Sequence, residues 1–368
     1  MSKVTDQILT KRPLTLDEIH GQPMAIRFFK YCLEKDDIPG GGILVHGEGG
    51  SGKTTAICAF IRTVLCLNRE LGGTKPCLQC LSCQNLKDPK EGTHPNVKWV
   101  QVGRGSSRGE DSLNNQVNEA LEATKTGPYY NGKPHQNYKF IVVDEVQNLP
   151  VNLLQRFLYF PESLHQQQIY NVRLIFSTMN LHRVNQDTIA SLRGRMVEVP
   201  FQSPSFDDLW VVGKKVNPDV PDNILVRICD QVVQVGGGYR QLINYLDVLG
   251  KVYGFEEAAV NQYLGRASRE QIDHFWRICS RCPHDRQAYL DSVHYFEHLL
   301  KVCNGDVKRL YGQLFNSLLW ILSQPQATPG HYEALRGLAH GITEGYYPAH
   351  AILSFCQGLP HIPLVENV

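Results

Sequence analysis

The sequence of 368 residues contains no long hydrophobic run. Its longest apolar stretches, such as LLWIL at 318–322, are far shorter than the roughly 20 residues that a membrane-spanning helix needs. The N-terminus, MSKVTDQILTKRPLTLDE, lacks the apolar core of a signal peptide, so we expect a cytoplasmic protein with no membrane partner. An excess of charge is missing too, since 37 Lys and Arg face 36 Asp and Glu. This balance excludes a general polycation but not a local basic surface.

Internal repeats and low-complexity tracts are also absent, so the hydrophobic pattern is the guide to organisation. Apolar runs that read as strands alternate with helical stretches up to about residue 202, and beyond it the pattern is helical only. Continuous apolar strands alternating with helices are typical of a parallel sheet covered on both faces, which is an α/β fold. The expected strands span 43–46, 97–102, 139–145 and 172–178, and one of the helices spans 151–160.

This change of pattern divides the chain into three predicted domains. The α/β domain takes residues 1–203, a small helical domain takes 204–266, and a C-terminal all-α domain takes 267–368. The clearest helix of the last domain begins after Asp306, a residue type that caps helix N-termini, and carries apolar residues on one face up to Leu322.

Residues 47–54 read GEGGSGKT and match the phosphate-loop pattern GxxxxGK[ST]. The glycines let consecutive backbone N–H groups turn toward phosphate oxygens, and the following helix presents its positive N-terminus. Lys53 is expected to reach the β- and γ-phosphates of a nucleotide, and Thr54 to hold Mg²⁺. A strand before the loop and a helix after it disfavour a chance glycine-rich turn. The predicted cofactor-binding residues of the loop are Gly47, Gly49, Gly50, Ser51, Gly52, Lys53, Thr54 and Thr55.

An acid pair, Asp144 and Glu145, follows the apolar run FIVV at the end of the third expected strand. An aspartate at this position is how a parallel sheet delivers a Mg²⁺ ligand beside a phosphate loop, here together with Thr54. Glu145 is then placed to orient and deprotonate the attacking water. Adjacent acids also occur as a solvated strand end, but the phosphate loop favours the catalytic interpretation. Together the two motifs predict ATP hydrolysis.

Cysteine is not scarce, since the chain has 11, and four of them fall within residues 66–83. The odd total and the expected reducing compartment argue against a disulfide framework and favour a metal. The spacing C-x10-C-x2-C-x2-C lets four thiolates surround tetrahedral Zn²⁺, which leaves no open position for catalysis. Unliganded thiols and an iron–sulfur cluster are the alternatives, although nothing suggests electron transfer. The expected zinc ligands are Cys66, Cys77, Cys80 and Cys83.

The order of these motifs resembles that of AAA+ clamp loaders, the family typified by the gamma/tau subunit of bacterial DNA polymerase III. The resemblance covers roughly residues 8–265, whereas the last hundred residues are similar only in being helical. It is carried by Lys11-Arg12-Pro13, Asp17-Glu18-Ile19, Gly21-Gln22, the phosphate loop, the four cysteines, His94-Pro95, Asp144-Glu145-Val146 and Gly238-Tyr239-Arg240.

The resemblance implies further roles. Arg12, Ile19 and Gln22 would lie near the adenine, and Arg240 would be a sensor arginine on a lid helix that contacts the γ-phosphate. The family also carries a zinc module at the position of residues 66–83, with a slightly shorter first gap. The three predicted domains then become a P-loop ATPase domain, a helical lid and a collar-like oligomerisation domain.

Two motifs depart from the family pattern. The first sensor is a polar residue after the fourth strand, and here Thr178 and Asn180 compete for that role. The family's Ser-Arg-Cys arginine finger, which completes a neighbour's ATP site, is replaced by SLRGRM at 191–196. Arg195 sits best relative to the following strand, and Arg193 is the competitor. A finger supplied in trans contributes several orders of magnitude in rate.

Other signals are weaker. Arg104 and Arg108, within GRGSSRG, are candidates for gripping DNA phosphates, although no aromatic residues interleave with them. A second CxxC, Cys279 and Cys282 with His284 nearby, has no second pair and reads as chance cysteines.

The resemblance implies an ATPase subunit of a clamp loader, active only in an assembled, pentameric ring with partner subunits, a sliding clamp and primer–template DNA. Its expected cofactors are ATP, Mg²⁺ and structural Zn²⁺. Two other classes stay open: a different AAA+ switch such as a helicase loader, and a stator that binds nucleotide without turnover.

Overall fold

The computed structural model of the chain describes residues 12–86, 94–102, 110–125, 128, 133–157, 171–179, 181, 190, 192–279, 281 and 286–323. The candidate DNA contacts Arg104 and Arg108, the candidate sensor Asn180, and Cys282 with His284 lie outside these residues. In the described part, no helix is long and apolar enough to cross a bilayer.

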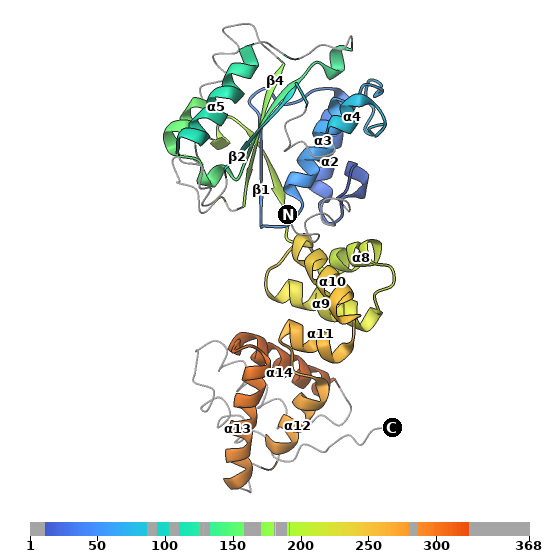
Figure 1. Ribbon diagram of the computed structural model, residues 1–368, viewed down its shortest axis with the longest axis vertical. Coiled ribbons are helices and arrows are strands. Elements are labelled where there is room, and N and C mark those ends of the chain that lie inside the picture. Colours follow the sequence, from blue (N-terminus) through green and yellow to red (C-terminus); the bar gives the residue numbers. More distant parts are fainter. Residues whose placement is uncertain are drawn as a thin grey trace. The chain divides into compact units, whose positions relative to one another are not determined.

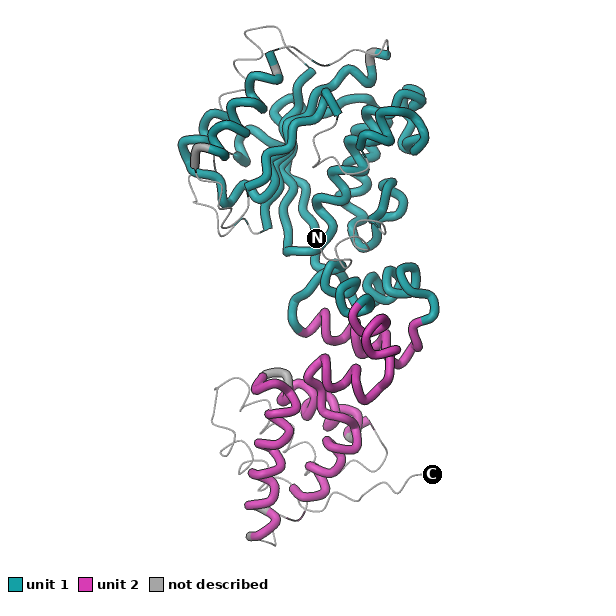
Figure 2. Tube along the Cα trace, in the orientation of Figure 1, with its two compact units in different colours: residues 1–219, 235–247 teal, residues 220–234, 248–368 magenta. Residues whose placement is uncertain are grey.

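By its internal contacts the chain divides into two compact units, which are coloured separately in Figure 2. Unit 1 comprises residues 1–219 and 235–247, and unit 2 comprises 220–234 and 248–368. The division into three domains with boundaries at 203 and 266 stays a prediction. Each unit is described by itself below.

A five-stranded parallel sheet forms the centre of unit 1, with the order β2-β3-β4-β1-β5. The predicted α/β fold with a parallel sheet is thereby confirmed. All six residues of β3 are buried, which explains why its four central residues, 140–143, are continuously apolar rather than alternating. Because the strands are parallel, their carboxyl ends meet at one edge, and the phosphate loop and the acid pair both follow strands at that edge. The strands are β1 (Ile43–Gly47), β2 (Val97–Gln101), β3 (Lys139–Asp144), β4 (Val172–Thr178) and β5 (Val197–Phe201).

Helices cover both faces of this sheet (Figure 1). On one face lie α2 (Pro23–Lys35), α3 (Lys53–Val64) and the short α4 (Leu81–Asn85); on the other lies α5 (Glu110–Lys125). Residues 151–157 are also helical. The remaining elements of unit 1 are η1 (Leu16–Glu18), η3 (Pro134–Gln136), η4 (Val146–Asn148), α8 (Phe206–Val216) and the first part of α10 (Tyr239–Tyr253).

Local sequence signals set several helix ends. Pro23 opens α2, where its missing N–H is not needed. Gly52, with φ near +100°, lets the chain turn from the phosphate loop into α3. Ser205 and Asp208 form a capping box at the start of α8, which satisfies two backbone donors that the helix leaves free.

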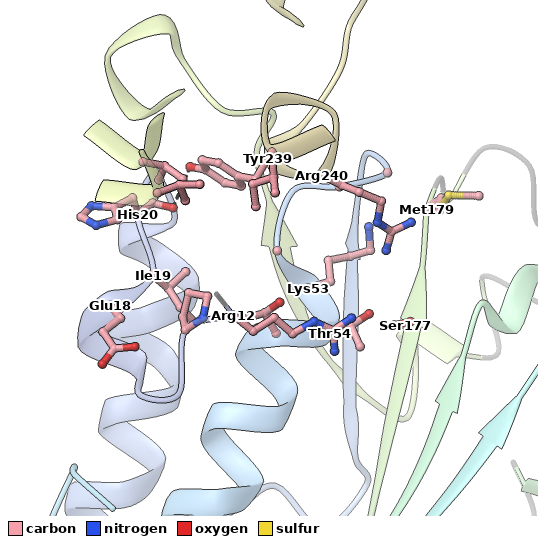
Figure 3. Close-up of a pocket in the computed structure, with 18 of the residues that line it drawn as sticks. Arg12, Glu18, Ile19, His20, Lys53, Thr54, Ser177, Met179, Tyr239 and Arg240 are labelled. Atoms are coloured by element: carbon pink, nitrogen blue, oxygen red, sulfur yellow. Dashed lines mark hydrogen bonds between the residues drawn. The ribbon is translucent and has the colours of Figure 1, made fainter. Parts of the chain in front are cut away.

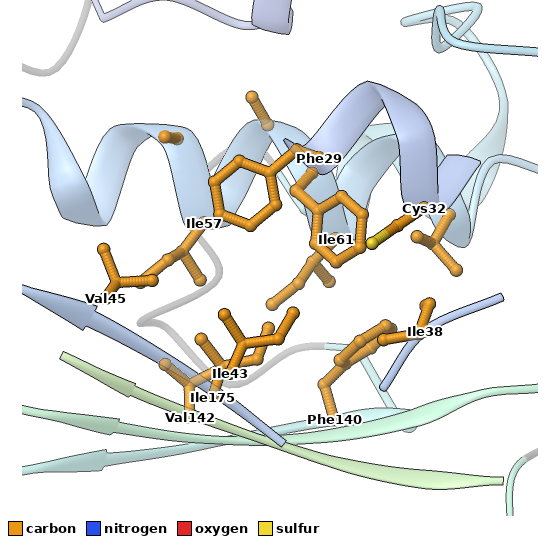
Figure 4. Close-up of a cluster of buried hydrophobic side chains, with 14 of the residues drawn as sticks. Phe29, Cys32, Ile38, Ile43, Val45, Ile57, Ile61, Phe140, Val142 and Ile175 are labelled. Carbon is orange, nitrogen blue, oxygen red and sulfur yellow. The ribbon is translucent and has the colours of Figure 1, made fainter. Parts of the chain in front are cut away.

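The core of unit 1 is split by the sheet into two clusters of buried side chains. The cluster under α2 and α3 packs the rings of Phe29 and Phe60, whose centroids lie 4.8 Å apart, against strand residues such as Ile43 and Val142 (Figure 4). The second cluster lies under α5 and includes Val117 and Phe176. Each fully buried side chain of this kind contributes about 1.5–3 kcal/mol, so this burial holds the helix that follows the phosphate loop against the sheet.

Unit 2 is entirely helical in its described residues, as the sequence predicts for this part of the chain. Its C-terminal core gathers Phe275, Trp276, Phe296 and Leu314 from three helices. The helix expected after Asp306 is observed as α14 (Val307–Leu322). The other helices are α9 (Asp222–Gln234), the last part of α10, α11 (Glu257–Leu264), α12 (Arg269–Cys279) and α13 (Arg286–Val302).

Candidate functional site

A cavity of about 540 Å³ opens beside the carboxyl ends of β3 and β4 in unit 1, and several of its residues are shown in Figure 3. This volume lies within the range of small-molecule sites. Its wall combines the segment 12–20, which we call the pocket segment, with the phosphate loop, the acid pair, α8 and the first turn of α10. The lining residues are Arg12, Pro13, Glu18, Ile19, His20, Gly49, Gly50, Gly52, Lys53, Thr54, Thr55, Asp144, Glu145, Ser177, Met179, Val212, Lys215, Val216, Tyr239, Arg240 and Ile243.

Lys53 is the buried cation of the phosphate loop. Its Nζ donates to the carbonyl oxygens of Gly47, at 2.6 Å, and Glu48, at 2.8 Å. An ammonium has three donors, so one is left to point at a ligand in the cavity. Burial lowers the pKa of Lys53 to about 8, against the opposing attraction of Asp144 and Glu48. The loop therefore holds a desolvated positive charge against the cavity, which favours a polyanionic ligand.

Six of the eight predicted loop residues line the cavity, and Gly47 and Ser51 do not. Gly47, with φ near +148°, is pressed against the backbone of Phe201, so a side chain there has no space. The buried hydroxyl of Ser51 donates to the carbonyl of Glu48 at 2.9 Å. These two residues shape the loop, and the others face the cavity.

The acid pair stands at the end of β3, and a serine on the neighbouring strand holds it. The Ser177 hydroxyl donates to Asp144 Oδ1 and accepts the backbone N–H of Glu145 at 3.3 Å. The side chain of Asn148 donates to Glu145 Oε2 at 3.2 Å. Glu145 itself has φ near +60°, which is uncommon for a residue other than glycine and turns the backbone from β3 into η4. Both carboxylates thus occupy defined positions at the cavity.

Helix α10 begins directly against the phosphate loop. The Tyr239 backbone N–H donates to the carbonyl of Gly50 at 3.0 Å, and its hydroxyl donates to the carbonyl of His20 at 2.9 Å. A Cβ on Gly238 would lie 2.6 Å from the Gly50 backbone, so only glycine permits this approach. Burial raises the pKa of the Tyr239 phenol, which keeps the hydroxyl a donor. This contact brings the adjacent Arg240 to the cavity wall near Lys53 (Figure 3).

Two of the three residues that the resemblance places near adenine, Arg12 and Ile19, line the cavity, and the third, Gln22, does not. The Gln22 amide is buried and bonds backbone on two sides. It donates to the carbonyls of Ser51, at 3.2 Å, and Gln202, at 2.7 Å, and accepts the Gln202 N–H at 2.9 Å. Gln22 therefore ties the phosphate loop to the chain that follows β5.

Of the candidates at the two departures from the family pattern, Thr178, Arg193 and Arg195 lie within the described residues, and none of the three lines the cavity. The hydroxyl of Thr178, the candidate sensor, is fully buried and makes no hydrogen bond. Arg193 pairs with Glu198 at 2.8 Å, and Glu198 also approaches His46, the residue before the phosphate loop, at 3.4 Å. In the described part of the chain neither Arg193 nor Arg195 lines the cavity, and both are exposed. An arginine that acts in the ATP site of a neighbouring subunit has to be exposed in this way.

The four predicted zinc ligands do come together. Their sulfur atoms all lie within 4.8 Å of one another, and Cys66 and Cys80 Sγ are 4.0 Å apart. Backbone N–H groups of three of the cysteines, together with the Asn68 side chain, donate to these sulfurs at 3.2–3.5 Å. Such donors stabilise thiolates. A hydrogen bond shared with Cys83 lowers the pKa of the Cys66 thiol to about 4. The donor set fits a closed tetrahedral zinc site. We call residues 66–86 the four-cysteine module.

Ser177, Asn148 and Tyr239 are site residues without a predicted role. Ser177 stands one position before the expected sensor, and a polar residue closing an apolar strand at the ligand-binding edge was the available signal. Asn148 follows the acid pair by three residues. Tyr239 lies within the predicted Gly-Tyr-Arg motif, but only the fold shows that its hydroxyl reaches the pocket segment.

Comparisons with known proteins agree with this arrangement. The family model described as "DNA polymerase III, delta subunit" matches residues 21–203, which hold the sheet, the phosphate loop, the acid pair and the four cysteines. No curated protein sequence matches the chain.

Two solved structures of low sequence identity are similar. Domain III of the replication initiation protein DnaA from Thermotoga maritima is 14% identical over 66% of this chain and 91% of its own, with a TM-score of 0.39. The Aeropyrum pernix ORC1 protein in complex with DNA is 16% identical over 92% and 85%, with a TM-score of 0.43. Because both scores lie below 0.5, the fold assignment rests on the strand order and the phosphate loop instead.

Proposed function

Since this chain carries a domain of the AAA+ clamp-loader-like family, we propose that it is the ATP-hydrolysing subunit of a DNA sliding-clamp loader. The observation that supports catalysis is one cavity that joins the phosphate loop, the acid pair Asp144 and Glu145, and Arg240. A subunit that serves only as a structural arm does not need that combination. In this proposal ATP binding opens the clamp and grips primer–template DNA, and hydrolysis releases both.

The nucleotide phosphates bind along the loop between β1 and α3. Backbone N–H groups of the loop and the buried Lys53 ammonium face the phosphate oxygens, while Arg240 approaches the γ-phosphate from α10. Thr54 and Asp144 both line the cavity and offer the oxygen ligands that Mg²⁺ prefers. Mg²⁺ bound there neutralises phosphate charge. The apolar lining of α8 and α10, Val212, Val216 and Ile243, together with Ile19, forms the wall for the base.

Hydrolysis is assigned to Glu145 with help from two neighbours. Its carboxylate orients a water molecule whose oxygen attacks the γ-phosphorus, the water proton passes toward Glu145, and the bond to the β–γ bridging oxygen breaks so that this oxygen leaves with ADP. Asn148 and Ser177 hold the two carboxylates, through the contacts described above. Preorganised carboxylates avoid reorganisation during the reaction.

In the assembly, each ATP site is completed by an arginine from the neighbouring subunit. An exposed arginine at 193–195 reaches the ATP of a neighbouring subunit, so turnover belongs to the ring rather than to the lone chain. Partner subunits, a sliding clamp and primer–template DNA are the proposed partners, in a pentamer. Arg104 and Arg108 stay candidate DNA contacts. The four-cysteine module holds structural zinc. With four protein ligands the metal has no open coordination position, so it takes no part in ATP hydrolysis.

Lys53→Ala tests the function directly. We expect it to abolish ATP-dependent loading of a fluorescent sliding clamp onto primed circular DNA by the reconstituted complex, because the buried phosphate contact is lost. Lys125→Ala is the matched control, since Lys125 is exposed and pairs with the equally exposed Glu122 within α5, at 2.6 Å. Full loading by the Lys53 variant would reject the proposal. Capture of a replicative helicase without any clamp binding would favour the helicase-loader alternative, and nucleotide binding without turnover in the complete assembly would favour a stator.

Ser177→Ala is expected to weaken Mg²⁺-ATP binding by about three- to tenfold, because Asp144 loses the hydroxyl that holds it. Thr178→Val should change the same affinity by less than about twofold, because the Thr178 hydroxyl is buried and bonds nothing. Titration with a fluorescent ATP analogue at fixed Mg²⁺ measures both. The reverse order of the two effects would support the predicted role of Thr178 as the sensor.

A further inference from the structure

We propose that the buried Arg62 is a positioning residue that couples the four-cysteine module to the nucleotide cavity. Binding of metal to the module and binding of nucleotide to the cavity then strengthen each other. The inference rests on the proposed function in taking the cavity as the nucleotide site. It concerns how the wall of the cavity is kept in position, and it gives the four-cysteine module a role in nucleotide binding.

Arg62 lies on the last turn of α3 and is 2% exposed. Its Nη1 donates to the carbonyl of Leu14 and its Nη2 to the carbonyl of Leu86, both at 2.6 Å. The guanidinium is planar and rigid, so it fixes the two carbonyls relative to each other. A desolvated cation is costly unless its partners stay in place, which makes this bridge stiff.

Leu14 belongs to the pocket segment and directly follows Arg12 and Pro13 of the cavity wall. Its N–H donates to Glu18 Oε2 at 2.8 Å, so both backbone polar groups of Leu14 are held. Leu16, two residues on, is buried in the core under α2 and α3. The position of the cavity wall from Arg12 to Ile19 therefore depends on the hydrogen bond from Arg62 to the Leu14 carbonyl.

Leu86 closes the four-cysteine module. It follows α4, which carries Cys83, and its side chain is fully buried in the same core. At the other end of the module Cys66 comes two residues after α3, the helix that begins with Lys53. A metal on the four thiolates joins Cys66 to Cys83 and so fixes Leu86 against α3.

A second link runs between the same two regions. Lys75, inside the module, pairs with Asp17 of the pocket segment at 3.1 Å, and Asp17 also pairs with Lys30 of α2 at 2.5 Å. Both lysines lower the pKa of the Asp17 carboxyl, which keeps it charged. Lys75 is 75% exposed, so this link is the weaker of the two.

Coupling between two binding sites is reciprocal. If zinc strengthens nucleotide binding by some factor, nucleotide strengthens zinc binding by the same factor. This equality holds for any mechanism of coupling, so it checks that both measurements are at equilibrium. A positioning role is separated from a merely structural one by a variant that stays folded and binds zinc but has lost the coupling.

The test uses the full chain with a fluorescent ATP analogue and with Zn²⁺ in competition with a chromophoric chelator. We expect zinc to tighten nucleotide binding by about five- to tenfold, and nucleotide to tighten zinc binding by the same factor. Arg62→Lys, which keeps the charge but cannot span both carbonyls, should reduce both factors to below about twofold. Circular dichroism and zinc stoichiometry check that this variant folds.

Lys75→Ala keeps the test decisive if Arg62→Lys does not fold. It should lower the coupling factor by about twofold, whereas Lys125→Ala, which breaks an exposed pair on the other face of the sheet, should leave it unchanged. Nucleotide binding that depends on Lys53 but is the same with and without zinc would overturn the coupling and leave the proposed function standing. Absence of Lys53-dependent binding would overturn both.

Discussion

Glu145→Gln is expected to reduce ATP hydrolysis by the assembled complex by about 10²–10⁴-fold while leaving nucleotide affinity within about twofold. The amide keeps the size of the side chain and its approach to Asn148, which now bonds Glu145 at 3.2 Å, but it cannot take a proton from water. Asp144, Thr54 and Lys53, which are assigned to the phosphates and Mg²⁺, are unchanged. Binding and turnover should therefore separate.

Phosphate release during clamp loading and equilibrium binding of an ATP analogue measure the two effects in one preparation. Glu34→Gln, an equivalent change at an exposed position of α2, is the matched control and should behave as wild type. If Glu145→Gln hydrolyses ATP at the wild-type rate, Glu145 is not the base, and the acid pair loses its proposed division of roles. If binding falls as well, Glu145 also holds Mg²⁺ or the phosphates.

Arg195→Ala should lower hydrolysis in the assembled complex by about 10³-fold or more, with no change in nucleotide binding by the lone chain. The physical reason is that an arginine from a neighbour stabilises charge that develops only in the transition state. The two candidate arginines stand on the exposed segment before β5, where the backbone carbonyl of Arg195 lies so close to Gly41 that a Cβ there would clash with it.

Arg193→Ala is the discriminating companion variant. Arg193 is already paired with Glu198 at 2.8 Å, and a finger would have to leave that partner, so we expect Arg193→Ala to slow hydrolysis by less than tenfold. Steady-state hydrolysis with clamp and DNA present compares the two. A large loss confined to Arg193→Ala would move the finger to that residue, and wild-type rates for both variants would contradict a finger on this turn.

Several parts of the site follow from short-range patterns and were predictable for that reason. A phosphate loop is built by consecutive residues, since the glycines, Lys53 and the helix start must be adjacent in the chain to form it. The acid pair likewise needs only an apolar strand that ends in acid. The four cysteines are spaced for one ion, and their sulfurs do lie within 4.8 Å of one another. The parallel sheet follows from continuous apolar strands that alternate with helices.

Other residues acquired their roles only from contacts between distant segments. Gln22 was expected near the base, but its amide bonds the chain 180 residues away, at Gln202. Ser177 reaches the acid pair because β4 lies beside β3, an order that no local pattern specifies. From the sequence alone Arg62 would be expected on the solvent side of its helix. In the fold it is buried and donates to the carbonyls of Leu14 and Leu86.

By itself, then, the sequence determined the short-range motifs of this chain, which are a phosphate loop, an acid pair and a cluster of four cysteines, and the α/β class of the domain that carries them. The tertiary structure alone decided which side chains support that chemistry. Hydrogen-bond partners of buried groups such as Arg62 and Gln22 are chosen by strand order and helix packing, because a buried polar group must find its partner wherever the fold places one.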